Sequence, residues 1–164
     1  AALSILTEED FFLGSIEYLK EVRAITSLPI LRKDFMVDEY QIYEAKLMGA
    51  DCILLIASIL SDSQITAFVT LAEELELDYL IEVHDEVELS RVEDFQEAMI
   101  GVNNRDLKTF TVDLDNSVRL KHKFKHSNIF IAESGIKNQD DIDYLKSHQI
   151  HAFLIGESLM MDSF

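Results

Sequence analysis

The stretch LPILRKDFMVDEYQIYEAKLMGADCILLI, residues 28–56, carries the clearest structural pattern in this sequence of 164 residues. A short apolar segment runs into three consecutive charges, RKD at 32–34. A helical pattern follows and stops at Gly49, and the continuous apolar run at 52–56 is typical of a strand covered on both faces. We therefore predict a strand, a helix and a second strand that is parallel to the first and joined to it by a right-handed crossover.

The composition fits a single globular domain covering residues 1–164, with 48% hydrophobic residues. The charge is strongly acidic, because 14 Lys and Arg stand against 31 Asp and Glu, for a formal net charge of −17. Such a charge argues against nucleic acid, a membrane surface or another large polyanion as partner. A small phosphorylated ligand stays compatible with it, since a local group of backbone amides and one or two cations can outweigh the overall field.

Signals for targeting and for disulfides are sparse. The single cysteine, Cys52, lies inside an apolar run and builds no disulfide framework, which favours a reducing compartment. No apolar run reaches the roughly 18 residues of a membrane span. The acidic start AALSILTEED lacks the basic segment of a signal peptide. We therefore expect a cytoplasmic protein.

The alternation of strand and helix continues along the whole chain. We predict seven strands. Six are expected at residues 3–6, 52–56, 78–83, 98–102, 129–132 and 152–155, and another begins at residue 30 and ends among the charges at 32–34. Six helices are expected between them, at 16–25, around 42–48, and at 62–75, 86–95, 114–124 and 139–147. This order is that of a (βα)8 barrel that lacks its first strand and its last helix, and barrels of this type need about 250 residues. An open doubly wound sheet is the competing architecture.

Polar side chains gather where the predicted strands end, which is where barrel proteins place their chemistry. They are Thr7, Glu8, Lys33, Asp34, Ser58, Glu82, His84, Asn103, Arg105, Glu133, Ser134 and residues 156–158. A buried charge without a partner is costly, so Lys33 and Glu82 either form structural ion pairs or take part in chemistry, and both readings stay open. Phe11, Phe12 and Phe35 follow strand ends as well, where a core position and the lining of a flat ligand site are both open.

The last two strand ends carry a more specific pattern, ESG at 133–135 and IGES at 155–158. A phosphate needs several converging N–H donors, and glycines after the last two strands let the backbone approach it closely. Arg105 would add a charge-assisted contact to the same anion. The alternative is that Gly135 and Gly156 only form tight turns.

The histidines favour structural roles. His122 and His126 form one close pair and His148 and His151 another, but neither pair has a third ligand nearby, so we expect no metal site. His84 is expected at the rim of the strands or as a helix cap rather than as a base.

Nine segments, in matching order and spacing, carry a resemblance to a known family. They are SILTE (4–8), FFLGS (11–15), LPILRKDF (28–35), QIYEA (41–45), GADCILLI (49–56), IEVHD (81–85), IGVNNRDL (100–107), ESGI (133–136) and IGESLM (155–160). Over almost its whole length the chain resembles the indole-3-glycerol phosphate synthases of tryptophan biosynthesis. The resemblance implies a TIM barrel and a lyase that needs no cofactor and no metal. Its reaction is ring closure of 1-(2-carboxyphenylamino)-1-deoxyribulose 5-phosphate with loss of carbon dioxide and water.

The resemblance also implies roles for individual residues. Lys33, in the KDF motif, corresponds to the general acid, Glu82 to the carboxylate that handles protons during dehydration, and Asn103 to the amide that orients the substrate. Phosphate binding falls on Arg105, Ser134, Gly135, Gly156 and Glu157. Glu157 would contribute its backbone N–H, because its carboxylate would repel the ligand. The positions that enclose the anthranilate ring are Phe12, Phe35, Leu54 and Leu107.

The sequence also departs from the family's pattern. The family's first strand, with a further catalytic lysine and glutamate in a motif resembling E-x-K-x-x-S-P-S, is not found here, nor are the amino-terminal extension and the final helix. An incomplete barrel exposes strand edges, so we expect these residues alone to be unstable or to self-associate, with little or no activity, while the full-length protein is the synthase. The expected partner is a small phosphorylated substrate, and association with other tryptophan-pathway enzymes or with a second copy is left open.

Two alternatives to the synthase remain. One is another phosphate-binding barrel such as phosphoribosylanthranilate isomerase, which is disfavoured because Cys52 lies at the start of its strand rather than at its end. The other is a non-catalytic fragment that self-associates through its open edge.

Overall fold

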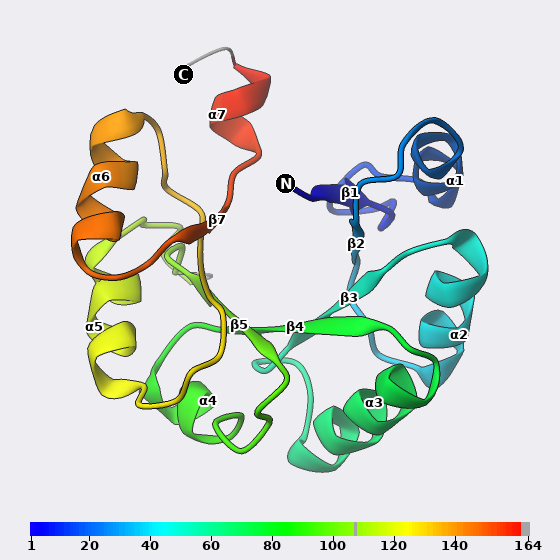
Figure 1. Ribbon diagram of the computed structural model, residues 1–164, viewed down its shortest axis with the longest axis horizontal. Helices are drawn as coiled ribbons and strands as arrows, with labels where there is room; N and C mark the ends of the chain where they lie inside the picture. The colour runs from blue at the N-terminus through cyan, green and yellow to red at the C-terminus, as the bar shows by residue number, and fades with distance from the viewer. Residues whose placement is uncertain (107, 162–164) are drawn as a thin grey trace. The chain divides into compact units, whose positions relative to one another are not determined.

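The computed structural model describes residues 1–106 and 108–161 (Figure 1). Its sheet has seven strands in the order β1-β2-β3-β4-β5-β6-β7. The strands are β1 (Leu3–Leu6), β2 (Ile30–Lys33), β3 (Cys52–Ile56), β4 (Asp78–Val83), β5 (Met99–Asn103), β6 (Phe130–Glu133) and β7 (Ala152–Leu154). The pairs β1·β2, β2·β3, β5·β6 and β6·β7 are parallel. The prediction of seven successive strands is confirmed.

Helices separate the strands, and a short one follows the last strand. They are α1 (Ile16–Ile25), α2 (Glu39–Met48), α3 (Asp62–Glu74), α4 (Glu86–Ser90), α5 (Asp115–Lys123), α6 (Gln139–Ser147) and α7 (Glu157–Met160). Side chains accept hydrogen bonds from the first backbone N–H groups of several helices, as at Ser15, Ser61 and Asn138. Gly49 ends α2 in the left-handed conformation, with φ of 86°.

The strand order decides between the two predicted architectures. A doubly wound sheet reverses its order at a switch point, whereas this order runs from β1 to β7 without reversal. The chain forms two compact units, residues 1–80 and 81–164, which are described separately. Within the first unit, α1, α2 and α3 lie along one side of the strands, and within the second α5 and α6 do the same (Figure 1). One-sided cover by helices is the arrangement of a (βα)8 barrel, of which the described residues contain seven strands.

Two predicted segments differ from the structure. The helix expected at 86–95 ends at Ser90, and turns follow it. The N–H groups of Arg91, Val92 and Phe95 bond to carbonyls three residues back, as in turns, and the side chain of Asn128 then donates to the carbonyls of Phe95 and Ala98 at 2.9 and 2.8 Å. After β7, where no helix was expected, residues 157–160 form α7. Strands β5 and β6 each begin and end one residue later than predicted.

The core consists of the strands and the helix faces against them. All five residues of β3 are buried, which confirms that both faces of this strand are covered. Among residues 1–106 and 108–161, no helix combines the length and the apolar character needed to cross a membrane.

Candidate active site

Three consecutive charges mark the end of β2, and the alternation of the strand divides them between two faces. Successive side chains of a strand point to opposite faces, so Arg32 and Asp34 share one face and Lys33 takes the other. The side chains of Arg32 and Asp34 are 3% and 9% exposed, whereas Lys33 is half-buried. The two flanking charges are therefore part of the interior, and Lys33 lies apart from them.

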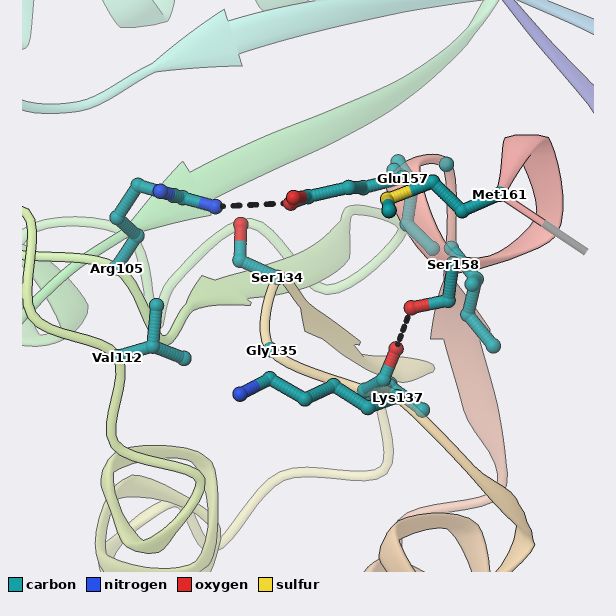
Figure 2. A pocket seen from close by; sticks show the side chains of 12 residues that line it. Arg105, Val112, Ser134, Gly135, Lys137, Glu157, Ser158 and Met161 are labelled. Carbon is teal, nitrogen blue, oxygen red and sulfur yellow. Dashed lines mark hydrogen bonds and ion pairs between the residues drawn. The ribbon is translucent and has the colours of Figure 1, made fainter. Parts of the chain in front are cut away.

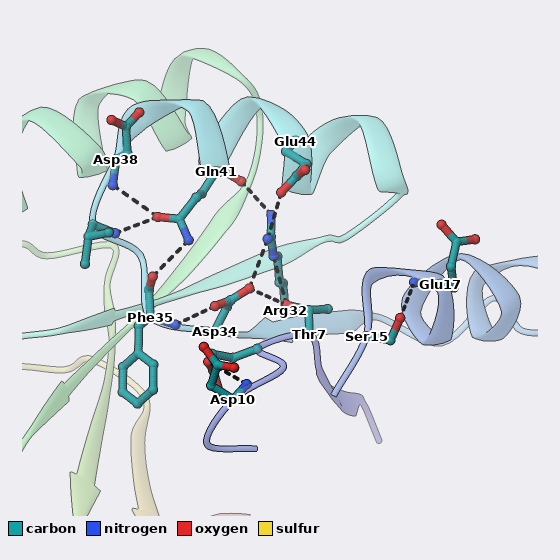
Figure 3. Close-up of polar contacts among 12 residues, drawn as sticks. Thr7, Asp10, Ser15, Glu17, Arg32, Asp34, Phe35, Asp38, Gln41 and Glu44 are labelled. Atoms are coloured by element: carbon teal, nitrogen blue, oxygen red, sulfur yellow. Dashed lines mark hydrogen bonds and ion pairs between the residues drawn. The ribbon is translucent and has the colours of Figure 1, made fainter. Parts of the chain in front are cut away.

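Arg32 is the centre of a buried polar network (Figure 3). Its guanidinium contacts the carboxylates of Asp34 and Glu44 at 3.0 and 2.8 Å. It also donates to the hydroxyl of Thr7 at 3.0 Å and to the carbonyl of Gln41 at 2.9 Å. The hydroxyl of Thr7 donates in turn to Asp34 at 2.6 Å. The network joins the ends of β1 and β2 to α2 and so fixes the backbone that carries Lys33.

An aromatic pair lies beside Lys33. The rings of Phe12 and Phe35 stack with their centroids 4.9 Å apart and an angle of 26° between their planes. The Nζ atom of Lys33 lies 5.5 Å from the centre of the Phe12 ring, within the range of a cation–π contact. The sequence left open whether these phenylalanines are core or lining, and both rings are half-buried rather than enclosed.

Glu8 shapes the loop that carries Phe12. Its carboxylate accepts hydrogen bonds from the backbone N–H groups of Asp10, Phe11 and Phe12 at 3.0, 2.6 and 2.9 Å. Desolvation of the carboxylate acts to raise the pKa of Glu8, but these three donors together lower it below its usual value. The loop after β1 is thus closed around an ionised carboxylate, which holds Phe12 near Lys33.

In the second unit, Glu82 and Asn103 lie on neighbouring strand ends and form a hydrogen bond. The side-chain amide of Asn103 donates to Oε1 of Glu82 at 3.0 Å, and Glu82 is 3% exposed. The Nε2 atom of His84 lies 3.3 Å from the same oxygen, and its Nδ1 lies 3.1 Å from Oε2 of Glu88. Burial lowers the pKa of His84, but its contacts with Glu82 and Glu88 outweigh burial and raise the pKa to about 10.

Two further asparagines hold these strand ends in place: Asn104, directly after β5, and Asn116, on α5. Asn104 is buried, and its amide donates to the carbonyl of Ser134 at 3.2 Å while its Oδ1 accepts from the N–H and hydroxyl of Ser117 at 3.0 and 2.7 Å. Asn116 donates to the carbonyls of His84 and Asn103 at 3.0 and 3.3 Å. Sequence reasoning missed both asparagines, because only their partners from distant segments reveal their role.

A pocket of about 450 Å³ opens beyond β6 and β7 (Figure 2). All five residues that the resemblance assigns to phosphate binding line it, namely Arg105, Ser134, Gly135, Gly156 and Glu157. The structure therefore brings these five residues together. Lys137 also lines the pocket, and neither the motifs nor the resemblance had pointed to it. In Figure 2 the hydroxyl of Ser134 points between the side chains of Arg105 and Glu157, whose NH2 and Oε2 atoms are 3.4 Å apart.

The two glycines of this pocket differ in backbone conformation and in the space around them. Gly135 has φ of 82°, and an added Cβ would lie 2.2 Å from the side chain of Val112, so the backbone and its packing both require glycine. Gly156 has φ of −122°, which other residues adopt, and an added Cβ would have no atom within 4 Å. The expected tight turn accounts for Gly135 but not for Gly156, whose missing side chain leaves open space at the pocket.

The remaining candidates lie elsewhere. Leu54 is fully buried in β3, and Leu107 lies outside the described residues. Cys52 is buried as well, and burial raises the pKa of its thiol, so it stays protonated. The ring of His122 packs edge-on against His148 with their centroids 6.1 Å apart. In the part of the chain that the structure describes, no three His, Cys, Asp or Glu side chains are arranged to hold a metal ion.

Strands in sequential order, helices along one side of them and polar residues after their carboxyl ends define a protein of the (βα)8-barrel class. A family model described as "Indole-3-glycerol phosphate synthase" matches residues 1–163. The chain belongs to the indole-3-glycerol phosphate synthase family. This match does not favour the isomerase.

Relatives in the family support the same assignment. An indole-3-glycerol phosphate synthase from a Polaromonas species is 50% identical over 160 residues, which cover 98% of this chain and 61% of the relative. The enzyme of that name from Lachnoclostridium phytofermentans is 48% identical over 163 residues, covering 99% of this chain and 60% of the relative. The chain thus spans about three fifths of the length of these relatives.

Solved structures that are distant in sequence share the fold. The 3-hexulose-6-phosphate synthase of Salmonella typhimurium has a TM-score of 0.78 at 14% identity, covering 96% of this chain and 78% of that one. A tryptophan synthase complex from Pyrococcus furiosus contains a chain with a TM-score of 0.68 at 18% identity, covering 90% of this chain and 62% of that one. These likenesses establish the fold alone.

Proposed function

We propose that the full-length protein is an indole-3-glycerol phosphate synthase of tryptophan biosynthesis. It closes the indole ring of 1-(2-carboxyphenylamino)-1-deoxyribulose 5-phosphate with loss of carbon dioxide and water. The observation that carries this proposal is the pocket at β6 and β7, because five residues from three separate segments surround it, as the family's phosphate site requires.

The phosphate of the substrate binds in this pocket. Arg105 and Lys137 provide two positive charges in a protein whose net charge is −17. The backbone at Ser134 and Gly135 and at Gly156 and Glu157 supplies N–H donors, and charge-assisted contacts of this kind are about twice as strong as neutral ones. Arg105 follows Asn103 by two positions, and its N–H donates to Oδ1 of Asn103 at 3.0 Å, so anchoring the phosphate also orders the amide that orients the substrate.

Lys33 acts as the general acid, and its ammonium stabilises the negative charge that develops on the substrate carbonyl oxygen. Glu82 exchanges the protons of the dehydration step, and Asn103 orients the substrate. We assign the aromatic ring of the substrate to Phe12 and Phe35; Leu54, which the resemblance also implied, is fully buried in β3 and cannot contact a ligand in this structure. The stacked rings of Phe12 and Phe35 beside Lys33 support this assignment, since a flat ligand ring can extend such a stack.

The substrate is a small phosphorylated molecule, the reaction uses no cofactor, and the pathway is cytoplasmic. Residues 1–164 by themselves have little or no activity, because the family's further catalytic lysine and glutamate belong to a motif that these residues do not contain.

Turnover by the full-length protein tests the proposal. K33M and E82Q should each lower kcat by about 100- to 10,000-fold, the usual contribution of general acid–base groups. K20M is the matched control, because Lys20 forms an exposed ion pair with Glu17 and should leave kcat unchanged. Formation of indole-3-glycerol phosphate at normal rates by either K33M or E82Q would refute the assignment.

A further inference from the structure

His84 lies two residues after Glu82, where β4 ends at Val83. Side chains two positions apart along a strand point to the same face, which places the imidazole beside the carboxylate. Its Nε2 lies 3.3 Å from Oε1 of Glu82, and its Nδ1 lies 3.1 Å from Oε2 of Glu88. The His84 side chain is 15% exposed, so these contacts are shielded from water on most sides.

Both ring nitrogens therefore face carboxylates. A neutral imidazole has one N–H, so one of the two carboxylates would meet a lone pair, whereas an imidazolium presents an N–H to each. The contact of Nδ1 with Glu88 is a hydrogen bond, and the contact of Nε2 with Glu82 is an ion pair at 3.3 Å that is not aligned as a hydrogen bond. The pKa of about 10 for His84 agrees with a ring that is protonated at neutral pH. The geometry alone leads to the same conclusion, since each carboxylate lies within reach of one nitrogen.

The other groups around His84 hold it in this position. Its backbone N–H donates to Oε2 of Glu88 at 2.7 Å, and its carbonyl accepts from Asn116 at 3.0 Å. Arg119 on α5 donates in turn to Oδ1 of Asn116 at 2.6 Å. The carboxylate of the neighbouring Asp85 accepts from the N–H of Glu88 at 2.9 Å and so caps α4.

We propose that His84 is a positioning residue for Glu82: the imidazolium orients the Glu82 carboxylate and keeps it ionised, so that Glu82 enters the reaction as a proton acceptor. This inference rests on the proposed function. In the dehydration step Lys33 gives a proton to the hydroxyl that leaves as water, and Glu82 takes the proton that the substrate loses. His84 keeps its own proton throughout.

A purely structural role is the competing explanation. In that case His84 would only connect the end of β4 to α4, and its loss would lower stability without changing how Glu82 titrates. The two roles differ in the pH dependence of catalysis. An adjacent opposite charge lowers the pKa of a carboxylate by about 1–3 units, so loss of the imidazolium raises the pKa of the catalytic carboxylate.

The test is the pH profile of kcat for the full-length protein and its H84N variant. We expect the acidic limb of H84N to move upward by about 1 pH unit or more, with a fall of roughly tenfold in kcat on that limb and a smaller change on the plateau. E88Q keeps the contact between His84 and Glu82 and should shift the limb less. E86Q is the matched control, because it removes a carboxylate of α4 that forms an exposed ion pair with Lys123 instead, and its acidic limb should match that of the wild type.

The outcomes separate the inference from the function on which it rests. If E82Q retains normal turnover, the proposed function fails. If E82Q is inactive and the acidic limb of H84N does not move, only the role of His84 fails.

A second measurement does not depend on turnover or on the folding of H84N. NMR titration of the His84 ring in the wild-type chain should show a protonated imidazole through neutral pH, and E82Q should lower its midpoint by about 1 unit or more. A wild-type midpoint near the ordinary histidine value of about 6.5 would overturn the inference.

Discussion

The pocket contains two glycines, and the structure requires glycine at only one of them. Gly135 is in the left-handed region against Val112, whereas Gly156 has an ordinary backbone and faces open space. The same substitution at the two positions should therefore separate folding from binding.

We expect G135A to lower the free energy of unfolding by about 1–3 kcal/mol, the cost of a non-glycine residue in a disfavoured backbone region, with the contact to Val112 adding to it. G156A should change stability by less than about 0.5 kcal/mol. It should nevertheless weaken binding of inorganic phosphate, because the new methyl group takes up space in the pocket. Urea unfolding and phosphate titration of the same two variants check this. Equal phosphate affinity in G156A and wild type would place the anion elsewhere.

Glu157 contributes a carboxylate to the same pocket. Its Oε2 lies 3.4 Å from the guanidinium of Arg105. A bound phosphate therefore either displaces this carboxylate from Arg105 or shares the guanidinium with it. The pair is exposed, and such pairs contribute about 0.2–1 kcal/mol. We therefore expect E157Q to bind inorganic phosphate about two- to fivefold more tightly, as measured by calorimetry. E86Q, which breaks the exposed pair with Lys123, is the control for the change in net charge and should bind like the wild type.

At the scale of the secondary-structure elements, β2 shows how one strand serves both stability and chemistry. Arg32 and Asp34 belong to the network that joins β1, β2 and α2, while Lys33 points to the other face beside Phe12. Substitutions on the face of Arg32 and Asp34 should therefore affect stability, and substitutions of Lys33 should affect catalysis.

We expect D34N to lower the free energy of unfolding by about 1.5–3 kcal/mol, because a buried hydrogen bond between charged groups loses one of its charges. E17Q is the matched control, since the pair of Glu17 with Lys20 is exposed and contributes little. Chemical denaturation of the two variants measures the difference. If D34N unfolds at the same denaturant concentration as the wild type, the network around Arg32 does not stabilise the fold.

Most elements could be predicted because their signals are local. Ser15, Ser61 and Asn138 cap helices where the sequence predicts a start, and Gly49 ends α2. The predicted helix to residue 95 is instead a series of turns after Ser90, and the carbonyl of Phe95 is held by Asn128, which lies more than 30 positions away and outside any local pattern. Helix α7 has 4 residues, which is about one turn and too short to show periodicity.

The candidate site was predictable to a similar extent. Its residues follow strand ends, which the sequence locates well, but their partners come from elsewhere in the chain. The interpretation of His84 as a rim or cap residue missed its contacts, although the spacing to Glu82 and Glu88 held a signal. His84 follows Glu82 by two positions, so its side chain points to the same face as that of Glu82. It precedes Glu88 by four positions, and the turn from β4 into α4 brings Glu88 back to the ring of His84.

At the scale of the whole molecule, the chain spans about 61% of the relatives it matches. The phosphate pocket lies entirely within residues 81–164, so we expect it to function in the chain by itself. Turnover should be lower than that of the full-length protein by at least about 100-fold, since a single missing acid–base group has that effect. Phosphate affinity should agree within a few fold. Kinetics and phosphate titration of the two proteins side by side test this, and equal turnover would contradict it.

The division of labour along β2 bears on how new activities arise in this scaffold. Arg32 and Asp34 stabilise the strand, and the residue between them, Lys33, carries the reactive amine. Substitutions at position 33 alone therefore change the reactive group while the ion pair of Arg32 and Asp34 stays intact. A variant that replaces the amine at position 33 keeps a strand that the Arg32 network still stabilises, so the catalytic group of this fold can change through a single substitution.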